Sequence, residues 1–274
     1  MTGFREPPGP DGLREEPAPG GFRENAAPGG LRENHIAIEG RIRAACARAG
    51  RDPAEVRLIW VSKNHPRERL IEAQDLGARL FGENRVQEAL EKFPLPLPPD
   101  GGAPSVLHLI GRLQKNKVRK ILPLAAAIHS IDSVELLEAV DRIAGELGLR
   151  PDVFLQVNTS REPAKGGFEP GDLLPVLAAL PPLPHLRLVG LMTMGPLETP
   201  GGAPAGPEAA RRCFKELSDL LKAAQIQAAQ GDPVRAAALK DLVWLSMGMT
   251  GDFEVAIEAG AHFIRVGTGL FGAR

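Results

Sequence analysis

The amino-acid sequence predicts a (β/α)8 (TIM) barrel, an α/β fold in which eight parallel strands alternate with helices. Three observations support this fold class. The chain has 274 residues, 43% of them hydrophobic, which is enough to bury the core of one barrel domain. Eight short apolar segments occur, and segments with helical periodicity separate them. Eight strands close such a barrel, and a doubly wound open sheet is the alternative.

The individual elements follow from short apolar runs and from the helical spacing between them. Strands are expected at 56–62, 79–82, 106–110, 126–130, 153–158, 186–191, 242–246 and 262–266. Helices are expected at 67–77, 84–92, 114–122, 133–147, 171–180, 207–230 and 252–259. A further helix precedes the first strand and ends at Gly50. The Pro- and Gly-rich segments 94–105 and 196–206 are expected to be surface loops.

The N-terminal segment is repetitive. The motif Gly-Phe/Leu-Arg-Glu recurs every nine residues, starting at Gly3, Gly12, Gly21 and Gly30, with Pro- and Gly-rich spacers. Each unit has too few apolar residues to build a core, and the prolines disfavour a helix. We therefore expect a disordered repeat tail over 1–29 and one barrel domain over 30–274. An array of short interaction motifs is the alternative for the tail.

Composition narrows the function classes. The formal net charge of −1 gives no reason to expect nucleic acid or an anionic membrane as the main partner. No apolar run approaches the roughly 20 residues of a membrane span, and the N-terminus lacks a secretory signal pattern. Cys46 and Cys213 are expected to be buried or half-buried reduced thiols, and the histidines show no metal-ligand spacing. A cytoplasmic protein without a metal site is the expectation.

The first strand delivers a lysine to the rim of the core. In the stretch VRLIWVSKNHP, residues 56–66, the apolar run stops at Lys63. Side chains alternate along a strand, so Ile59, Val61 and Lys63 share the inward face. The carboxyl ends of barrel strands surround the active site, where such an amine can act as a nucleophile. A solvated lysine at a strand end is the alternative.

The last two strands end in sequences suited to an anion. The seventh ends in LSMGMTGDFE, which contains Ser246 and Gly248, just before a predicted helix. The eighth ends in IRVGTGLFG, which contains Gly267 and Thr268. Barrels frequently bind phosphate with the loops after strands seven and eight. Two ordinary glycine turns are the alternative.

Arg265 lies on the inward face of the eighth strand. An inward arginine is costly to bury unless a polar group meets it. A salt bridge to a barrel glutamate such as Glu83 is one possibility, and contact with a ligand is the other. Together, the lysine, the phosphate loops and the arginine describe a pocket for pyridoxal 5′-phosphate (PLP). The lysine amine would form a Schiff base with the cofactor aldehyde, and the loops would hold the phosphate.

A series of motifs carries a family resemblance. In order, they are VSKNHP, FGENRVQE, HLIGRLQKNK, HSIDS, QVNTSREPAKGGF, GLMTMGP, LSMGMTGDFEVAIEAG and IRVGTGLFG. Over about 31–272 the chain resembles the YggS/PROSC family of PLP homeostasis proteins, which have a single barrel of the alanine-racemase type. Two departures are Arg85, where the family usually has an aromatic residue, and Thr250, where it usually has serine.

The resemblance also implies roles for individual residues. It implies that Lys63 is the Schiff-base lysine, that Asn84 lies near the cofactor ring and that Arg265 lies at the pyridine nitrogen. It places four further residues around the phosphate: Ser246, Gly248, Gly267 and Thr268.

Binding the cofactor does not by itself imply catalysis. Alanine racemases need two acid/base groups, one of them a tyrosine, and carry a second β domain; this chain has no tyrosine and ends two residues after the last motif. Arg265 is a permanent donor and cannot pass a proton to the ring nitrogen. We therefore expect a non-catalytic PLP carrier, monomeric or weakly dimeric, that takes part in vitamin B6 homeostasis. Apo PLP-dependent enzymes are the expected recipients.

Two alternatives remain for the function. The first is a single-domain PLP-dependent amino-acid racemase or lyase. The second is an interaction module that uses the repeat tail and the basic segment 112–120, RLQKNKVRK, with the barrel as a scaffold.

Overall fold

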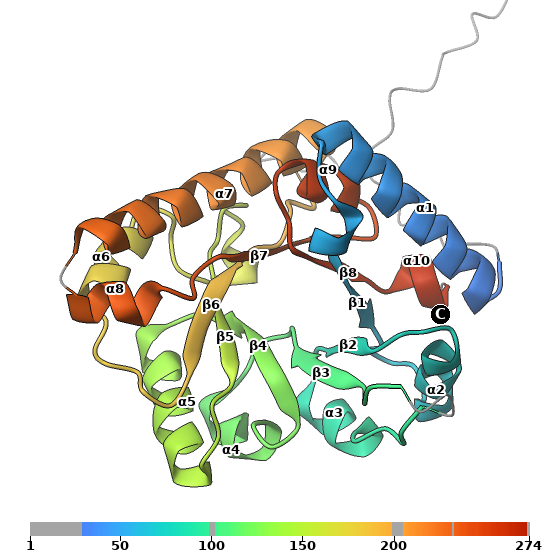
Figure 1. Cartoon of the computed structure of the whole chain (residues 1–274), viewed down its shortest axis with the longest axis horizontal. Helices are drawn as coiled ribbons and strands as arrows, with labels where there is room; N and C mark the ends of the chain where they lie inside the picture. The colour runs from blue at the N-terminus through green and yellow to red at the C-terminus, as the bar shows by residue number, and fades with distance from the viewer. Residues whose placement is uncertain (1–28, 99–101, 199–204, 232, 273–274) are drawn as a thin grey trace, which may run out of the picture.

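A closed barrel forms the centre of the molecule. The computed structural model describes residues 29–98, 102–198, 205–231 and 233–272, so nearly all of the predicted repeat tail lies outside the described residues. In the described part of the chain, eight parallel strands pair in sequence order, and β8 returns to pair with β1 (Figure 1). The predicted (β/α)8 barrel is confirmed, and the open sheet is excluded because the sheet closes.

The strands overlap the eight predicted segments. They are β1 (Arg57–Val61), β2 (Leu80–Glu83), β3 (Val106–Leu109), β4 (Ala125–Ile131), β5 (Asp152–Gln156), β6 (Arg187–Met192), β7 (Trp244–Met249) and β8 (Phe263–Val266). The largest difference is in β7, which continues to Met249 beyond the predicted end at 246. Met249 pairs with Arg265 of β8 beyond a register shift that follows Ser246, so β7 continues past this Gly-containing segment.

Helices occupy the predicted connections, with some corrections. They are α1 (Leu31–Ala49), α2 (Arg67–Asp75), α3 (Val86–Lys92), α4 (Val118–Ile121), α5 (Val134–Leu147), α6 (Leu173–Ala179), α7 (Pro207–Gln230), α8 (Pro233–Leu239), α9 (Phe253–Glu258) and α10 (Thr268–Phe271). The helix predicted over 114–122 is instead a 3-10 turn at Lys115–Lys117 followed by the short α4. The short helices α8 and α10 were not predicted.

The best-defined helices show why the chain folds locally as it does. At the start of α5, Ser133 Oγ accepts the Leu136 N–H, and at its end Gly148 adopts a left-handed conformation with φ 66°. Its apolar residues form one buried stripe facing the barrel: Leu136, Leu137, Val140, Ile143 and Ala144.

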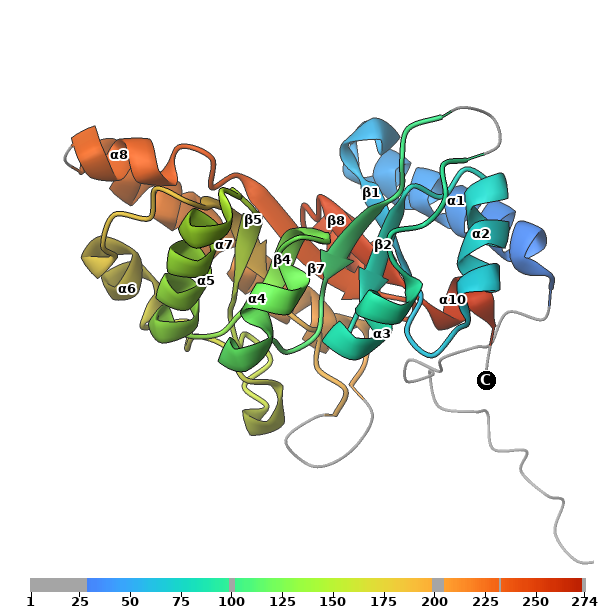
Figure 2. The ribbon, with the colours of Figure 1, turned by 90° about the horizontal axis from the view of Figure 1, so that it is seen from below.

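The N-terminal helix α1 packs on the last part of the barrel. It lies along α9 and α10 (Figure 1). Asn34 Nδ2 donates to the Leu270 carbonyl at 2.8 Å, and Arg41 forms two 2.8 Å bonds to the Glu254 carboxylate. At the other end of the molecule lie α6 and α8 (Figure 2). In the described residues, no helix is both long and apolar enough to cross a membrane.

The core has two layers. The larger one lies between the strands and the surrounding helices. The smaller one fills the barrel itself with side chains from alternate strand positions: Ile59, Val61, Ala127, Phe154, Val189, Met192 and Phe263. Polar side chains interrupt this inner layer near the carboxyl ends of the strands, and that is where the candidate site lies.

Candidate functional site

The predicted site residues converge on the carboxyl end of the barrel. Lys63 lies in the turn after β1, and Asn84 directly follows β2. Ser246 and Gly248 belong to β7, Arg265 belongs to β8, and Gly267 and Thr268 come directly after β8. Because β8 pairs with both β7 and β1, the lysine turn lies beside the β8 loop.

A buried ionic cluster holds the turn that carries Lys63. We call it the wall cluster: Ser62, Glu83, Glu88 and Lys92. Lys92 Nζ donates to the Ser62 carbonyl at 2.9 Å, to Glu83 Oε1 at 2.8 Å and to Glu88 Oε2 at 3.1 Å. Ser62 Oγ donates to Glu83 Oε1 at 2.6 Å, and the Asn64 N–H donates to Glu88 Oε2 at 2.8 Å. The residues on both sides of Lys63 are therefore fixed.

Burial governs the electrostatics of the wall cluster. Glu83 is fully buried and Lys92 is 7% exposed. Burial raises the pKa of Glu83, and the bonds from Lys92 and Ser62 only partly oppose it. Burial also acts to raise the pKa of Glu88, but the Asn64 N–H and Lys92 outweigh it, so that pKa is lowered overall. Lys92 thus donates to two carboxylates whose pKa values are shifted in opposite directions.

The possible salt bridge between Arg265 and Glu83 does not form. On β2, Gly82 faces the barrel interior, where an added Cβ would lie 2.6 Å from Ile59 Cγ2. Glu83 therefore points outward to the helix layer, where it meets Lys92 instead. Arg265 Nη1 donates to Ser246 Oγ and Nη2 donates to the Thr193 carbonyl, each at 2.8 Å. Burial lowers the pKa of Arg265 to about 10, and Asp252 counteracts this.

A line of polar side chains continues from Arg265 into the barrel. We call it the interior chain: His108, His129, Ser246 and Arg265. Ser246 Oγ lies 2.8 Å from His129 Nδ1, and His129 Nε2 lies 2.9 Å from His108 Nδ1. The Ser246 hydroxyl is thus engaged beneath Arg265. Within the described residues, no group of side chains forms a metal site.

The two loops predicted to bind phosphate are joined through Thr250. The hydroxyl of Thr268 donates to Thr250 Oγ1 at 3.2 Å, and the Gly269 N–H donates to the same oxygen at 3.3 Å. Gly248 has φ 93°, and an added Cβ would lie 2.6 Å from Ala256 Cβ. Only glycine allows β7 to turn this closely onto α9. Threonine in place of the usual serine keeps the hydroxyl that links the loops.

One buried polar atom at the carboxyl ends of the strands lacks a hydrogen-bond partner. Among the described residues, three buried side-chain oxygens have no hydrogen-bond partner: Glu83 Oε2, Asn84 Oδ1 and Gln227 Oε1. Asn84 is half-buried at the end of β2, among the predicted site residues. An unpaired buried amide oxygen is costly unless something donates to it, and a bound ligand is one way to satisfy it.

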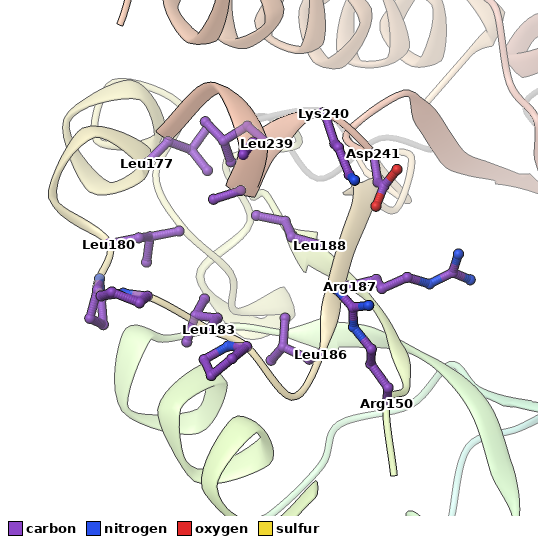
Figure 3. A pocket seen from close by; sticks show the side chains of 15 residues that line it. Arg150, Leu177, Leu180, Leu183, Leu186, Arg187, Leu188, Leu239, Lys240 and Asp241 are labelled. Carbon is purple, nitrogen blue, oxygen red and sulfur yellow. The ribbon is translucent and has the colours of Figure 1, made fainter. Parts of the chain in front are cut away.

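A cavity of about 420 Å³ lies away from these residues, at the opposite end of the barrel. Arg150 precedes β5 and Arg187 begins β6, so this cavity lies beside the starts of these two strands. Figure 3 shows leucines along one side of it, with Arg150, Arg187, Lys240 and Asp241 along the other. None of the predicted site residues lines it. This cavity is therefore separate from the candidate site.

Sequence reasoning missed the supporting residues. Lys92 was read only as the end of a helix, and nothing in its local spacing indicates that it reaches back to Ser62. His108 and His129 bond to each other from neighbouring strands, a contact that their spacing in the sequence does not indicate. Lys165 Nζ donates to the Gly195 carbonyl at 2.5 Å and forms an ion pair with Glu162, which places a second lysine at this end of the barrel.

Comparisons with known proteins agree with this geometry. The sequence profile of the family "Alanine racemase, N-terminal domain" matches residues 34–274. A pyridoxal phosphate homeostasis protein of Aquifex aeolicus is 38% identical over 235 residues, which are 85% of this chain and 94% of the relative. A protein of the same description from Pseudomonas aeruginosa is 39% identical over 242 residues, covering 86% and 93%.

Solved structures show the same fold. PipY of Synechococcus elongatus, solved with PLP bound, is 36% identical with a TM-score of 0.70, covering 88% of this chain and 100% of that one. An alanine racemase of Clostridium difficile has a TM-score of 0.59 at 15% identity, covering 89% and 56%, and this likeness concerns the fold alone. The predicted family resemblance is confirmed: the chain belongs to the family of pyridoxal phosphate homeostasis proteins, within the group defined by the alanine racemase N-terminal domain.

Proposed function

We propose that this protein binds pyridoxal 5′-phosphate at the carboxyl end of its barrel and takes part in vitamin B6 homeostasis. The observation that carries the proposal is the convergence of Lys63, Arg265 and the linked β7 and β8 loops at one end of the barrel. The family membership and the description of PipY with PLP bound support it.

The chemistry of these groups fits the cofactor. PLP supplies an aldehyde, which a lysine amine can hold as a Schiff base. Lys63 is half-buried in a turn fixed on both sides, which keeps its amine at the strand end. Asn84 Oδ1 has no hydrogen-bond partner within the protein and would lie near the cofactor ring. The backbone around Gly248, Gly267 and Thr268 would hold the phosphate.

Arg265 influences which reactions a bound cofactor could support. A guanidinium can only donate hydrogen bonds, and even a pKa lowered to about 10 keeps it protonated at neutral pH. It would orient the pyridine nitrogen without protonating it. A ring that stays unprotonated is a weaker electron sink, which disfavours transamination. Arg265 therefore suits a site that retains the cofactor unchanged.

We also propose that the protein carries PLP without turning over a substrate. The chain has no tyrosine to serve as the second base of a racemase. Burial raises the pKa of the Cys213 thiol, which disfavours the reactive thiolate. The Asp252 carboxylate accepts a hydrogen bond from the Met249 N–H at 2.5 Å, so this carboxylate is already engaged in holding the loop. Apo PLP-dependent enzymes are the proposed recipients.

The test is the absorbance of the purified protein with PLP, before and after borohydride, in wild type and Lys63→Ala. We expect a visible band in the wild type that borohydride abolishes and that the variant lacks. Lys165→Ala is the matched control, since it removes a different lysine at this end and should keep the band. A colourless wild type would refute the proposed binding. Exchange of the α-proton of alanine in deuterated water would instead support the racemase alternative.

A further inference from the structure

The interior chain is an unusual feature of a barrel core. Bulky apolar side chains normally fill the inside of such a barrel, and buried polar groups are costly unless they are hydrogen-bonded. His129 is fully buried and stacks on Phe154, with a centroid distance of 4.1 Å and an interplanar angle of 20°. His108 lies beside Phe263 at 5.7 Å. His129 is thereby shielded from water, so both of its ring nitrogens depend on protein partners.

Both histidines are neutral in the folded protein. Burial lowers the pKa of His108 to about 3, and the positive charge of Arg57 adds to this. Burial also lowers the pKa of His129 well below its ordinary value, with further contributions from His108 and Arg265. A neutral imidazole has one N–H donor and one acceptor nitrogen. Each ring can therefore donate in only one direction.

Arg265 determines the direction of every bond in the chain. Its guanidinium only donates, so Ser246 Oγ must accept from Nη1. The single proton of the Ser246 hydroxyl then goes to His129 Nδ1. This leaves the proton of His129 on Nε2, from which it is donated to His108 Nδ1. The opposite order would leave the serine hydroxyl with no acceptor among the described residues.

The ordered chain affects how firmly Arg265 is held. A hydroxyl that donates its own proton becomes a better acceptor, because successive hydrogen bonds polarise one another. Ser246 Oγ and the Thr193 carbonyl then each accept a hydrogen bond from one of the two Nη atoms. Within the described residues, protein acceptors engage two of the five guanidinium N–H groups, so other donors remain for a ligand.

We propose that His129 is a positioning residue that acts through Ser246 to fix the orientation of the Arg265 guanidinium. This inference rests on the proposed function only for its consequence, which is that the fixed guanidinium presents its donor to the cofactor ring. The orientation itself is a property of the protein without cofactor.

The variants can separate positioning from simple packing. In His129→Asn, Oδ1 occupies the place of Nδ1 and still accepts from Ser246, while the contact to His108 is lost. His129→Gln places its amide near Nε2, so it can reach His108 but leaves Ser246 without an acceptor. The two variants have the same functional group and similar polarity, so they form a matched pair. Ser246→Ala removes the link itself.

The first measurement needs no cofactor. NMR of the Arg265 side-chain N–H groups in the apo protein reports rotation of the guanidinium. We expect restricted rotation in the wild type and in His129→Asn, and faster rotation in His129→Gln and Ser246→Ala. Equal rotation in the Asn and Gln variants would overturn the proposal, because packing alone would then explain it. A urea titration of each variant confirms that it is folded.

The second measurement uses 4′-deoxypyridoxine 5′-phosphate, which has the ring and phosphate of PLP but no aldehyde. We expect His129→Gln to bind it about three- to tenfold more weakly than His129→Asn, the range for loss of one hydrogen bond. A difference in rotation with no difference in affinity would overturn the cofactor consequence. A wild type that binds neither this compound nor PLP refutes the proposed function, while the rotation result still decides the positioning role.

Discussion

A comparison of two buried polar systems in this barrel shows two different ways to hold a side chain at the strand ends. The wall cluster lies outside the strands, behind Lys63, and uses full charges: one lysine shared by two carboxylates. The interior chain lies inside the strands, beneath Arg265, and uses neutral imidazoles and a hydroxyl. Each system holds one residue that we propose to contact the cofactor.

The difference follows from the space on each side of the wall. Between β2 and α3 there is room for the long stem of Lys92 to cross to Ser62. Inside the barrel, Phe154 and Phe263 leave room for flat rings. Loss of one partner from a buried ion pair lowers the free energy of unfolding strongly, because it leaves an uncompensated charge. Neutral hydrogen bonds contribute less free energy and depend on the direction of the donor.

The largest expected effect comes from breaking the wall cluster. Lys92→Met keeps the length of the stem but leaves the fully buried Glu83 without its cation. Removal of one partner of a buried pair costs about 3–5 kcal/mol, which urea unfolding would measure. Adding Glu83→Gln in the same chain should recover much of this loss. A loss below about 1 kcal/mol in the single variant would show that water reaches the cluster.

An acid titration gives a smaller effect per pH unit and separates the two systems. In the interior chain, the histidines stay neutral when folded but take up protons when unfolded below pH 6.5. The unfolded state then binds more protons, so stability falls as the pH drops from 6.5 toward about 3. Each histidine adds a slope of about 1.4 kcal/mol per pH unit. His129→Asn should make the measured slope shallower by that amount.

Within the wall cluster, Glu83 should respond with the opposite sign. Burial raises the pKa of Glu83 above its ordinary 4.5, so this residue stabilises the fold at low pH and loses that contribution as the pH rises. The difference in unfolding free energy between wild type and Glu83→Gln should therefore shrink as the pH rises from 4.5. A difference that grows instead would mean that Lys92 dominates the carboxylate.

The smallest expected effect is at a surface pair outside both systems. Lys215 Nζ lies 2.6 Å from Asp219 on the exposed side of α7. Solvent screens such pairs, so Lys215→Ala should change the free energy of unfolding by less than about 0.5 kcal/mol. A loss comparable to that of Lys92→Met would remove the contrast between buried and exposed charge on which the comparison depends.

The local sequence pattern was sufficient to predict much of the fold. The apolar run before Lys63 and the helical stripe of α5 are properties of neighbouring residues, and both were predicted. The end of β7 was placed too early because Gly248 and Thr250 read as a loop, whereas β7 continues to Met249, which pairs with β8. The basic segment 112–120 read as one helix but divides into a turn and α4.

The sequence alone predicted the barrel, the family, and the order in which Lys63, Asn84, Arg265 and the glycine loops reach the strand ends. Alternation along strands and helical spacing are local, so they can be read without a structure. Only the tertiary structure decided which polar groups meet. Glu83 pairs with Lys92, and Arg265 reaches Ser246 from the neighbouring strand. Closure of the barrel makes these contacts, because a hydrogen bond requires an approach within about 3 Å that sequence distance does not encode.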